Sequence, residues 1–126
     1  MLADFRDYLK TLDIAEHYYI GKINNATEKA IGVYSMSNIA PVEAIGLASS
    51  YDVAGIRILI HWNKNADETE QTARTLYEAL RHITNTDMGS THVSMVSMDT
   101  GEPDFLGTDD NGVYEYHISL LVYYNR

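Results

Sequence analysis

Apolar residues recur at three- and four-residue spacing in two parts of the chain, and this pattern predicts two amphipathic helices. The first apolar stripe lies near the N-terminus and consists of Leu2, Phe5, Leu9 and Leu12. The second begins after Asn65, which suits a helix N-cap because Glu68 follows three residues later. Its stripe consists of Thr69, Ala73, Leu76, Tyr77, Leu80 and Ile83.

Between and after these helices, aromatic and β-branched segments predict strands. The clearest spans residues 53–62, where alternate residues from Ala54 to Trp62 are apolar and Arg57 and His61 lie on the other face. The remaining strands are expected at 17–22, 30–36, 91–98 and 113–124. We interpret the first two of these as strands on either side of a turn, and residues 37–52 as a long loop without a sustained period.

The order of elements predicts an α+β fold. Because the connections between strand pairs are too short for parallel crossovers, we expect a mostly antiparallel sheet with the two amphipathic helices packed on one face. The length of 126 residues suits a single domain, residues 1–126.

Composition narrows the functional classes. The chain has no cysteine, which excludes disulfides, thiol nucleophiles and cysteine-ligated metals. Its net charge of −9 opposes binding to phosphate backbones, and no apolar run approaches the ~20 residues of a membrane span. The first residues lack the basic and apolar segments of a secretory signal, so we expect synthesis in the cytoplasm. Ten tyrosines favour surfaces that become buried on association.

No recognisable catalytic constellation is present, so we expect neither enzyme activity nor a cofactor or metal. An acidic stretch between residues 99 and 110 resembles a calcium loop in composition, but its spacing does not fit an EF-hand. Asp104 and Glu115 resemble the acidic motif of a large nuclease family, yet His117 stands where that motif has a lysine.

One stretch near the C-terminus resembles the tail-terminator, or minor capsid, family of tailed bacteriophages. It reads Phe105-Leu106-Gly107-Thr108-Asp109-Asp110-Asn111-Gly112-Val113-Tyr114-Glu115-Tyr116 and is similar to the family's Phe-Leu-Gly motif, acidic gap, glycine and alternating aromatic strand. The helix from Asn65 to Ile83 and the segment Tyr19–Lys22 support the resemblance, which spans nearly the whole chain. Gly107 and Gly112 are also expected to permit positive φ at turns before the last strand.

The resemblance implies a structural virion protein. It implies a homo-oligomeric ring, expected to be a hexamer, at the head-proximal end of the tail tube in the tail or neck of the virion. Such a ring ends tube growth and joins the tail to the head, so its partners are the tail tube protein, a head-tail connector protein and other copies of itself. DNA passes through the lumen without specific binding, which suits an acidic surface.

Ring closure requires two different patches that meet between neighbouring copies. We expect these contacts in the long loop and in the acidic loop, with the residues Ile39, Pro41, Ile45, Leu47, Phe105, Leu106 and Asp109. Two alternatives stay open: a connector or stopper protein on the head side, which also forms a ring, and a small ligand-binding or regulatory domain.

Overall fold

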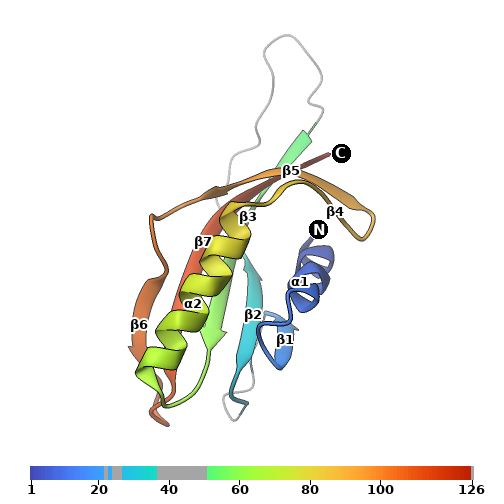
Figure 1. Ribbon diagram of the computed structural model, residues 1–126. Coiled ribbons are helices and arrows are strands. Elements are labelled where there is room, and N and C mark those ends of the chain that lie inside the picture. The colour runs from blue at the N-terminus through green and yellow to red at the C-terminus, as the bar shows by residue number, and fades with distance from the viewer. Residues whose placement is uncertain (22, 24–26, 37–50, 126) are drawn as a thin grey trace.

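The computed structural model describes residues 1–21, 23, 27–36 and 51–125. Two helices lie in front of a curled sheet of seven strands (Figure 1). The elements in chain order are α1 (Leu2–Thr11), β1 (His17–Ile20), β2 (Ala30–Ser35), β3 (Tyr51–His61), α2 (Ala66–Arg81), β4 (Thr84–Met88), β5 (Thr91–Met98), β6 (Asp104–Thr108) and β7 (Tyr114–Asn125).

The long strand β7 organises the sheet. The strand order is β1-β2-β3-β7-β5-β4, and β6 also pairs with β7. On one side β7 pairs with β3 along eleven registered positions, and on the other its first half pairs with β6 and its second half with β5. All of these pairs are antiparallel. The mostly antiparallel α+β fold expected from the sequence is therefore confirmed.

The pairing of the first two strands differs from the expected turn-connected pair, because β1 and β2 run parallel. β1 has only four residues, and all four are in register with β2. Between the two strands, the Ile23 side chain lies over Gly32. This contact is on the face opposite the helices, because Gly32 alternates with the core residues Ile31 and Val33. A Cβ at Gly32 would stand 2.7 Å from Cδ1 and 2.8 Å from Cγ1 of Ile23, so any other residue at this position would displace the Ile23 side chain.

Two strands were not expected from the sequence. β6 lies inside the predicted acidic loop, and β4 follows directly on α2, which ends at Arg81 and not at Ile83. β4 consists of Thr84-Asn85-Thr86-Asp87-Met88, a polar sequence that resembles a turn. It becomes a strand by pairing with the hydrophobic strand β5.

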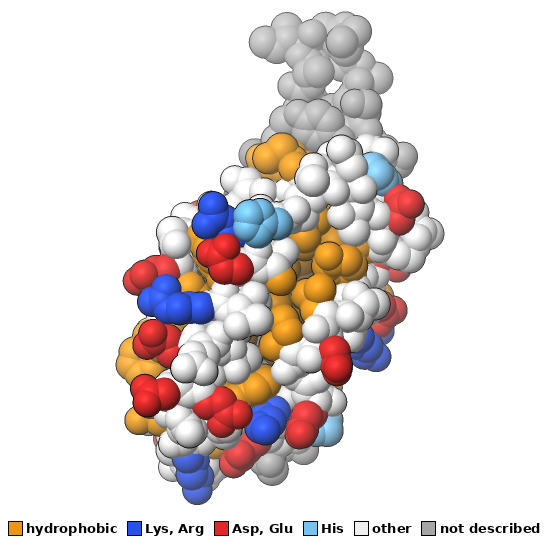
Figure 2. Space-filling view, viewed as in Figure 1, with side chains coloured by type: hydrophobic (Ala, Val, Ile, Leu, Met, Phe, Trp, Pro, Cys, Tyr) orange, Lys and Arg blue, Asp and Glu red, His pale blue; other side chains and the backbone are white. Residues whose placement is uncertain are grey.

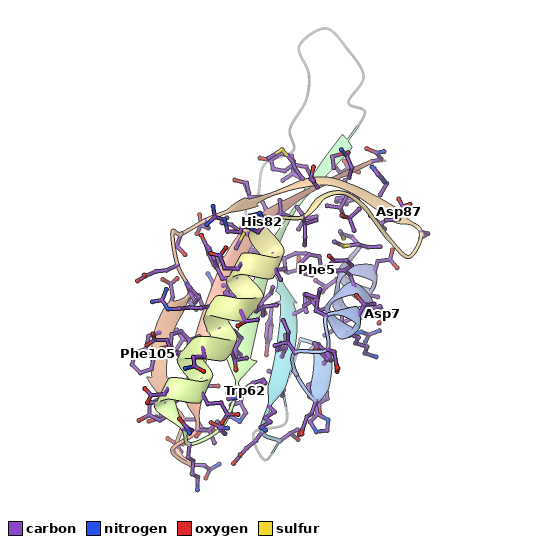
Figure 3. The ribbon with its side chains drawn as sticks, in the orientation of Figure 1. Phe5, Asp7, Trp62, His82, Asp87 and Phe105 are labelled. Carbon is purple, nitrogen blue, oxygen red and sulfur yellow. The ribbon has the colours of Figure 1, made fainter. Side chains whose placement is uncertain are left out.

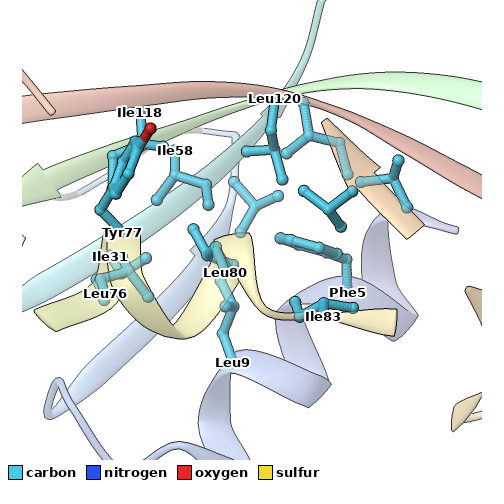
Figure 4. Close-up of a cluster of buried hydrophobic side chains, with 14 of the residues drawn as sticks. Phe5, Leu9, Ile31, Ile58, Leu76, Tyr77, Leu80, Ile83, Ile118 and Leu120 are labelled. Atoms are coloured by element: carbon cyan, nitrogen blue, oxygen red, sulfur yellow. The ribbon is translucent and has the colours of Figure 1, made fainter. Parts of the chain in front are cut away.

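The core lies between the helices and one face of the sheet (Figure 4). The α1 side chains Phe5 and Leu9 are fully buried, and so are the α2 side chains Leu76 and Leu80. They pack on alternate residues of the central strands, which include Ile31, Ile58, Ile118 and Leu120. Both helices therefore cover the same face, as expected, and none of the described helices is long and apolar enough to cross a membrane. We call the uncovered face of the sheet the open face.

Candidate assembly surface

A tight turn joins β6 to β7, and Asp109 holds it together. The Oδ1 atom of Asp109 accepts hydrogen bonds from the backbone N–H groups of Asn111 at 2.9 Å and Val113 at 3.0 Å. The backbone N–H of Asp109 also donates to the carbonyl of Val113. The bond from Val113, followed by the bond from Asn111 and the nearby His61 and Lys64, lowers the pKa of Asp109 against the opposing effect of burial.

The other oxygen of the same carboxylate faces His61 on the central strand β3. The side chain of His61 is 1% exposed, and its Nδ1 lies 3.0 Å from Oε2 of Glu115 on β7. Its Nε2 lies 3.7 Å from Oδ2 of Asp109. His61 thus stands between two carboxylates, and its hydrogen bond with Glu115 links the β7 arm of the hairpin to β3.

The hairpin presents an exposed apolar strand to solvent. On β6, Phe105 is 59% exposed and Leu106 is 47% exposed. Phe105 pairs with Tyr116 and shares the helix-covered side of the sheet, with its ring centroid 5.2 Å from that of Tyr116 and 6.2 Å from that of Tyr114. Figure 3 places Phe105 at the rim of the molecule, outside α2.

A β-bulge turns the neighbouring residue to the other side. The β6–β7 register shifts between Phe105 and Gly107, so Leu106 is the inserted residue, and it lines a hollow on the open face. Gly107 has φ +95° at this bulge, and Gly112 has φ +81° in the hairpin turn. Both glycines adopt a conformation that other residues rarely reach.

On the helix side of β6, a hollow of about 450 Å³ combines acids with aromatic rings. Its acidic walls come from both α2 and β6 and the segment before it: Asp67, Glu70, Glu102 and Asp104. Its one described basic residue, Arg74, reaches Glu70 at 3.3 Å and Glu102 at 3.8 Å. Burial raises the pKa of Tyr116 in this hollow, and Glu70 and Glu102 add to the effect while Arg74 opposes it.

On the open face, Leu106 borders a hollow of about 640 Å³ together with Tyr34, Arg57, Leu59 and His117. Nε of Arg57 donates to Oγ of Ser119 at 3.4 Å, and Nε2 of His117 lies 2.9 Å from Oδ2 of Asp104. Burial raises the pKa of Tyr34, and the charge of Glu115 raises it further against a hydrogen bond with the Ile23 backbone. β6 therefore separates two hollows of different character.

The residues expected to form contacts divide into three groups. Ile39, Pro41, Ile45 and Leu47 lie outside the described residues. Phe105 and Leu106 are on the surface, as an interface requires. Asp109 is half-buried, and its side chain is engaged within the hairpin. The role of each in assembly stays a prediction.

Two further exposed apolar residues were not singled out from the sequence. Ile20, at the end of the edge strand β1, is 40% exposed, and Met95, on the open face of β5, is 48% exposed. The sequence signal for Ile20 was weak, because its strand is short and its neighbours Tyr18 and Tyr19 are also large. Ile20 differs from Tyr18 and Tyr19 in its greater exposure to solvent, which only the structure shows.

The residues considered for chemistry are engaged with one another. Three strand histidines, His61, His92 and His117, each contact a carboxylate. Within the described ranges, no group of three or more histidine, aspartate and glutamate residues is arranged to hold a metal ion.

This architecture, a helix-covered sheet with an exposed apolar edge strand and an acidic surface, defines an α+β domain suited to association with other proteins. Residues 4–126 match the family described as "Bacteriophage tail terminator protein", and the chain belongs to that family. The protein thus has a structural role in a phage tail, as a component of the virion that associates with other tail and head proteins. No curated protein matches the chain.

Proposed function

We propose that this protein forms a closed ring at the head-proximal end of the tail tube, where it ends tube growth and joins the tail to the head. The ring is expected to contain six copies. Its partners are neighbouring copies, the tail tube protein on one side and a head-tail connector protein on the other. The protein is made in the host cytoplasm and is built into the neck of the virion.

The observation that carries this proposal is the exposed apolar strand β6 in a member of the tail terminator family. Phe105 and Leu106 are large, adjacent and exposed, and they project to opposite sides of the sheet. A monomer gains nothing from this exposure, whereas a subunit buries both residues on assembly.

The charge of the chain supports passage of DNA. Each copy carries a net charge of −9, so a ring of six presents a strongly acidic wall. Nucleic acid binds tightly where clustered lysine and arginine side chains displace counterions. An acidic lumen lacks those cations, so DNA slides through it without specific binding.

Electron microscopy of tail tubes assembled with and without the protein tests the proposal. We expect tubes of uniform length that carry extra density at one end only when the protein is present. Overlong tubes without caps in both conditions would refute a terminator role. Density on isolated portal complexes, with none on tubes, would assign the protein to the head side as a connector or stopper.

A further inference from the structure

We propose that neighbouring copies join edge to edge, with β6 of one copy pairing antiparallel with β1 of the next to continue the sheet around the ring. This inference rests on the proposed ring and specifies its subunit contact. In this arrangement Phe105 of one copy lies opposite Ile20 of the neighbouring copy.

The distribution of exposed apolar side chains first indicates this contact. Four large hydrophobic residues of the described chain are exposed: Ile20, Met95, Phe105 and Leu106. Three of them lie on edge strands, Ile20 on β1 and the other two on β6. Figure 1 shows these strands on opposite sides of the molecule, with β2, β3 and β7 between them. Exposed apolar edges promote pairing with another chain.

The two edges also offer backbone groups that point outward. The backbone N–H groups of His17 and Gly21 donate to the carbonyls of Lys29 and Val33, on the β2 side. Because backbone groups alternate in direction along a strand, the N–H groups of Tyr18 and Ile20 point away from β2. On β7, the carbonyl of Tyr114 accepts a hydrogen bond from the backbone N–H of Trp62, which directly follows β3. The backbone groups of even-numbered β7 residues therefore point toward β3, and those of odd-numbered residues point toward β6. Phe105 pairs with the even-numbered Tyr116, and its own backbone groups therefore point outward.

Side-chain direction agrees with the same pairing. Ile20 is aligned with Val33 and Phe105 with Tyr116, and both partners contact the helix-covered core. Ile20 and Phe105 are thus on the same side of the sheet. Residues directly opposite each other in an antiparallel pair have side chains on the same side, so the two can form a cross-strand pair.

Strand direction makes the contact antiparallel. β1 runs parallel to β2, and each later step through β3 and β7 to β6 reverses direction, so β1 and β6 run in opposite directions. Rotation about an axis along the strands preserves these directions and brings β6 of one copy beside β1 of the next. Five strands spaced about 4.8 Å apart span about 24 Å per copy, so six copies close a ring roughly 45 Å across at the sheet.

The size of the contact explains why it suits a ring better than a free pair. A stable interface buries about 800 Å² per partner. Strands of four and five residues are too short to bury that area when they pair as a single contact. In addition, the bulge at Leu106 limits regular pairing along β6, a device that protects edge strands from uncontrolled association. Each copy of a closed ring makes two such contacts, whereas each member of an isolated pair makes one.

Cysteine cross-linking tests the contact directly, because the chain has no cysteine of its own. In an antiparallel hydrogen-bonded pair the opposite Cα atoms lie about 5.5 Å apart, within the range of a disulfide. Oxidation of the I20C/F105C variant at high protein concentration, alone and on tail tubes, is expected to give a ladder of covalent oligomers that ends at a closed ring. Added salt is expected to raise the yield, since it screens the repulsion between acidic copies.

Three controls make the result specific. I20C and F105C alone are expected to give dimers at most, and a fast, complete F105C dimer would indicate β6–β6 pairing and overturn the inference. I20C/M95C places the second cysteine at an exposed residue of similar size that lies away from the edge. Ladders of equal yield from I20C/M95C, or none from I20C/F105C in either sample, would also overturn it. Circular dichroism confirms that each variant is folded.

The result separates this inference from the proposed function. If the unmodified protein caps tubes and I20C/F105C on those caps forms no ladder, the edge contact is wrong and the terminator role stands. If I20C/F105C closes covalent rings and the unmodified protein leaves tubes uncapped, the edge contact stands and the terminator role is wrong.

Discussion

The Oδ1 atom of Asp109 accepts a hydrogen bond from the backbone N–H of Val113 at 3.0 Å, and this bond closes the turn between the exposed strand β6 and β7. A second bond to the same oxygen comes from Asn111, so one carboxylate oxygen satisfies two backbone donors. The other oxygen of Asp109 faces His61 on β3. The position of Phe105 at the rim therefore depends on a turn four residues further along the chain.

Replacement of Asp109 tests this dependence. Asp109→Ala removes both acceptor contacts, so the melting temperature is expected to fall by several degrees. Asp109→Asn retains a side-chain oxygen that can accept the same hydrogen bonds, so its melting temperature is expected to fall clearly less than that of Asp109→Ala. Thermal unfolding at neutral pH measures both. An equal loss in the two variants would show that the charge of Asp109, and not its acceptor geometry, holds the turn.

The pH dependence of stability follows from the lowered pKa of Asp109. Its folded pKa lies below the unfolded value of about 3.9, so the ionised carboxylate stabilises the folded state above that value. This stabilisation by the ionised Asp109 carboxylate decreases as the pH falls below about 4, and it is lost once the pH falls below the folded pKa. We expect the stability difference between the unmodified protein and Asp109→Asn to be constant from pH 7 to pH 5 and to shrink toward pH 3.

Asp110→Asn is the matched control for this titration. Asp110 is the next residue along the turn and is exposed, so this variant removes one carboxylate and leaves the Asp109 hydrogen bonds in place. Its stability difference from the unmodified protein is expected to change little over the same pH range. A decline as steep as that of Asp109→Asn would mean that net charge governs the effect.

The sequence predicted the elements whose periodicity is set by burial. α2 and the alternating strand β3 were recognised because their apolar faces meet in the core, where Ile58 and Leu80 are fully buried. β6 was not recognised, because both of its central residues, Phe105 and Leu106, are exposed, and a bulge interrupts its alternation. The parallel pairing of β1 was not predicted either, since local spacing carries no information on strand direction.

The candidate surface was predicted only in part for the same reason. Phe105 and Leu106 were expected at an interface because of the motif around them, and both are exposed. The contacts of His61 with Asp109 and Glu115 join residues about fifty positions apart, so only the fold brings them together. Ile20 becomes notable only when its strand proves to be a sheet edge.

A contrast between two apolar residues tests the division between core and surface. Leu80 on α2 is fully buried in the main cluster, so Leu80→Ala is expected to cost about 2–5 kcal/mol in the free energy of unfolding. Phe105→Ala removes a larger side chain from an exposed position, and we expect it to cost less than about 1 kcal/mol. Denaturant titration measures both. A large loss at Phe105 would place that residue in the stabilising core.

Figure 2 shows hydrophobic surface beside acidic side chains at the left rim of the helix-covered face, and Figure 3 labels Phe105 at that rim. Phe105→Glu places another negative charge beside Glu102 and Asp104, so it is expected to abolish capping of tail tubes while the monomer stays folded. Met95→Glu introduces the same charge at an exposed apolar residue on the open face of β5. We expect Met95→Glu to cap tubes normally, as scored by electron microscopy. Normal capping by Phe105→Glu would remove β6 from the assembly surface, because a buried apolar contact does not tolerate an unpaired carboxylate.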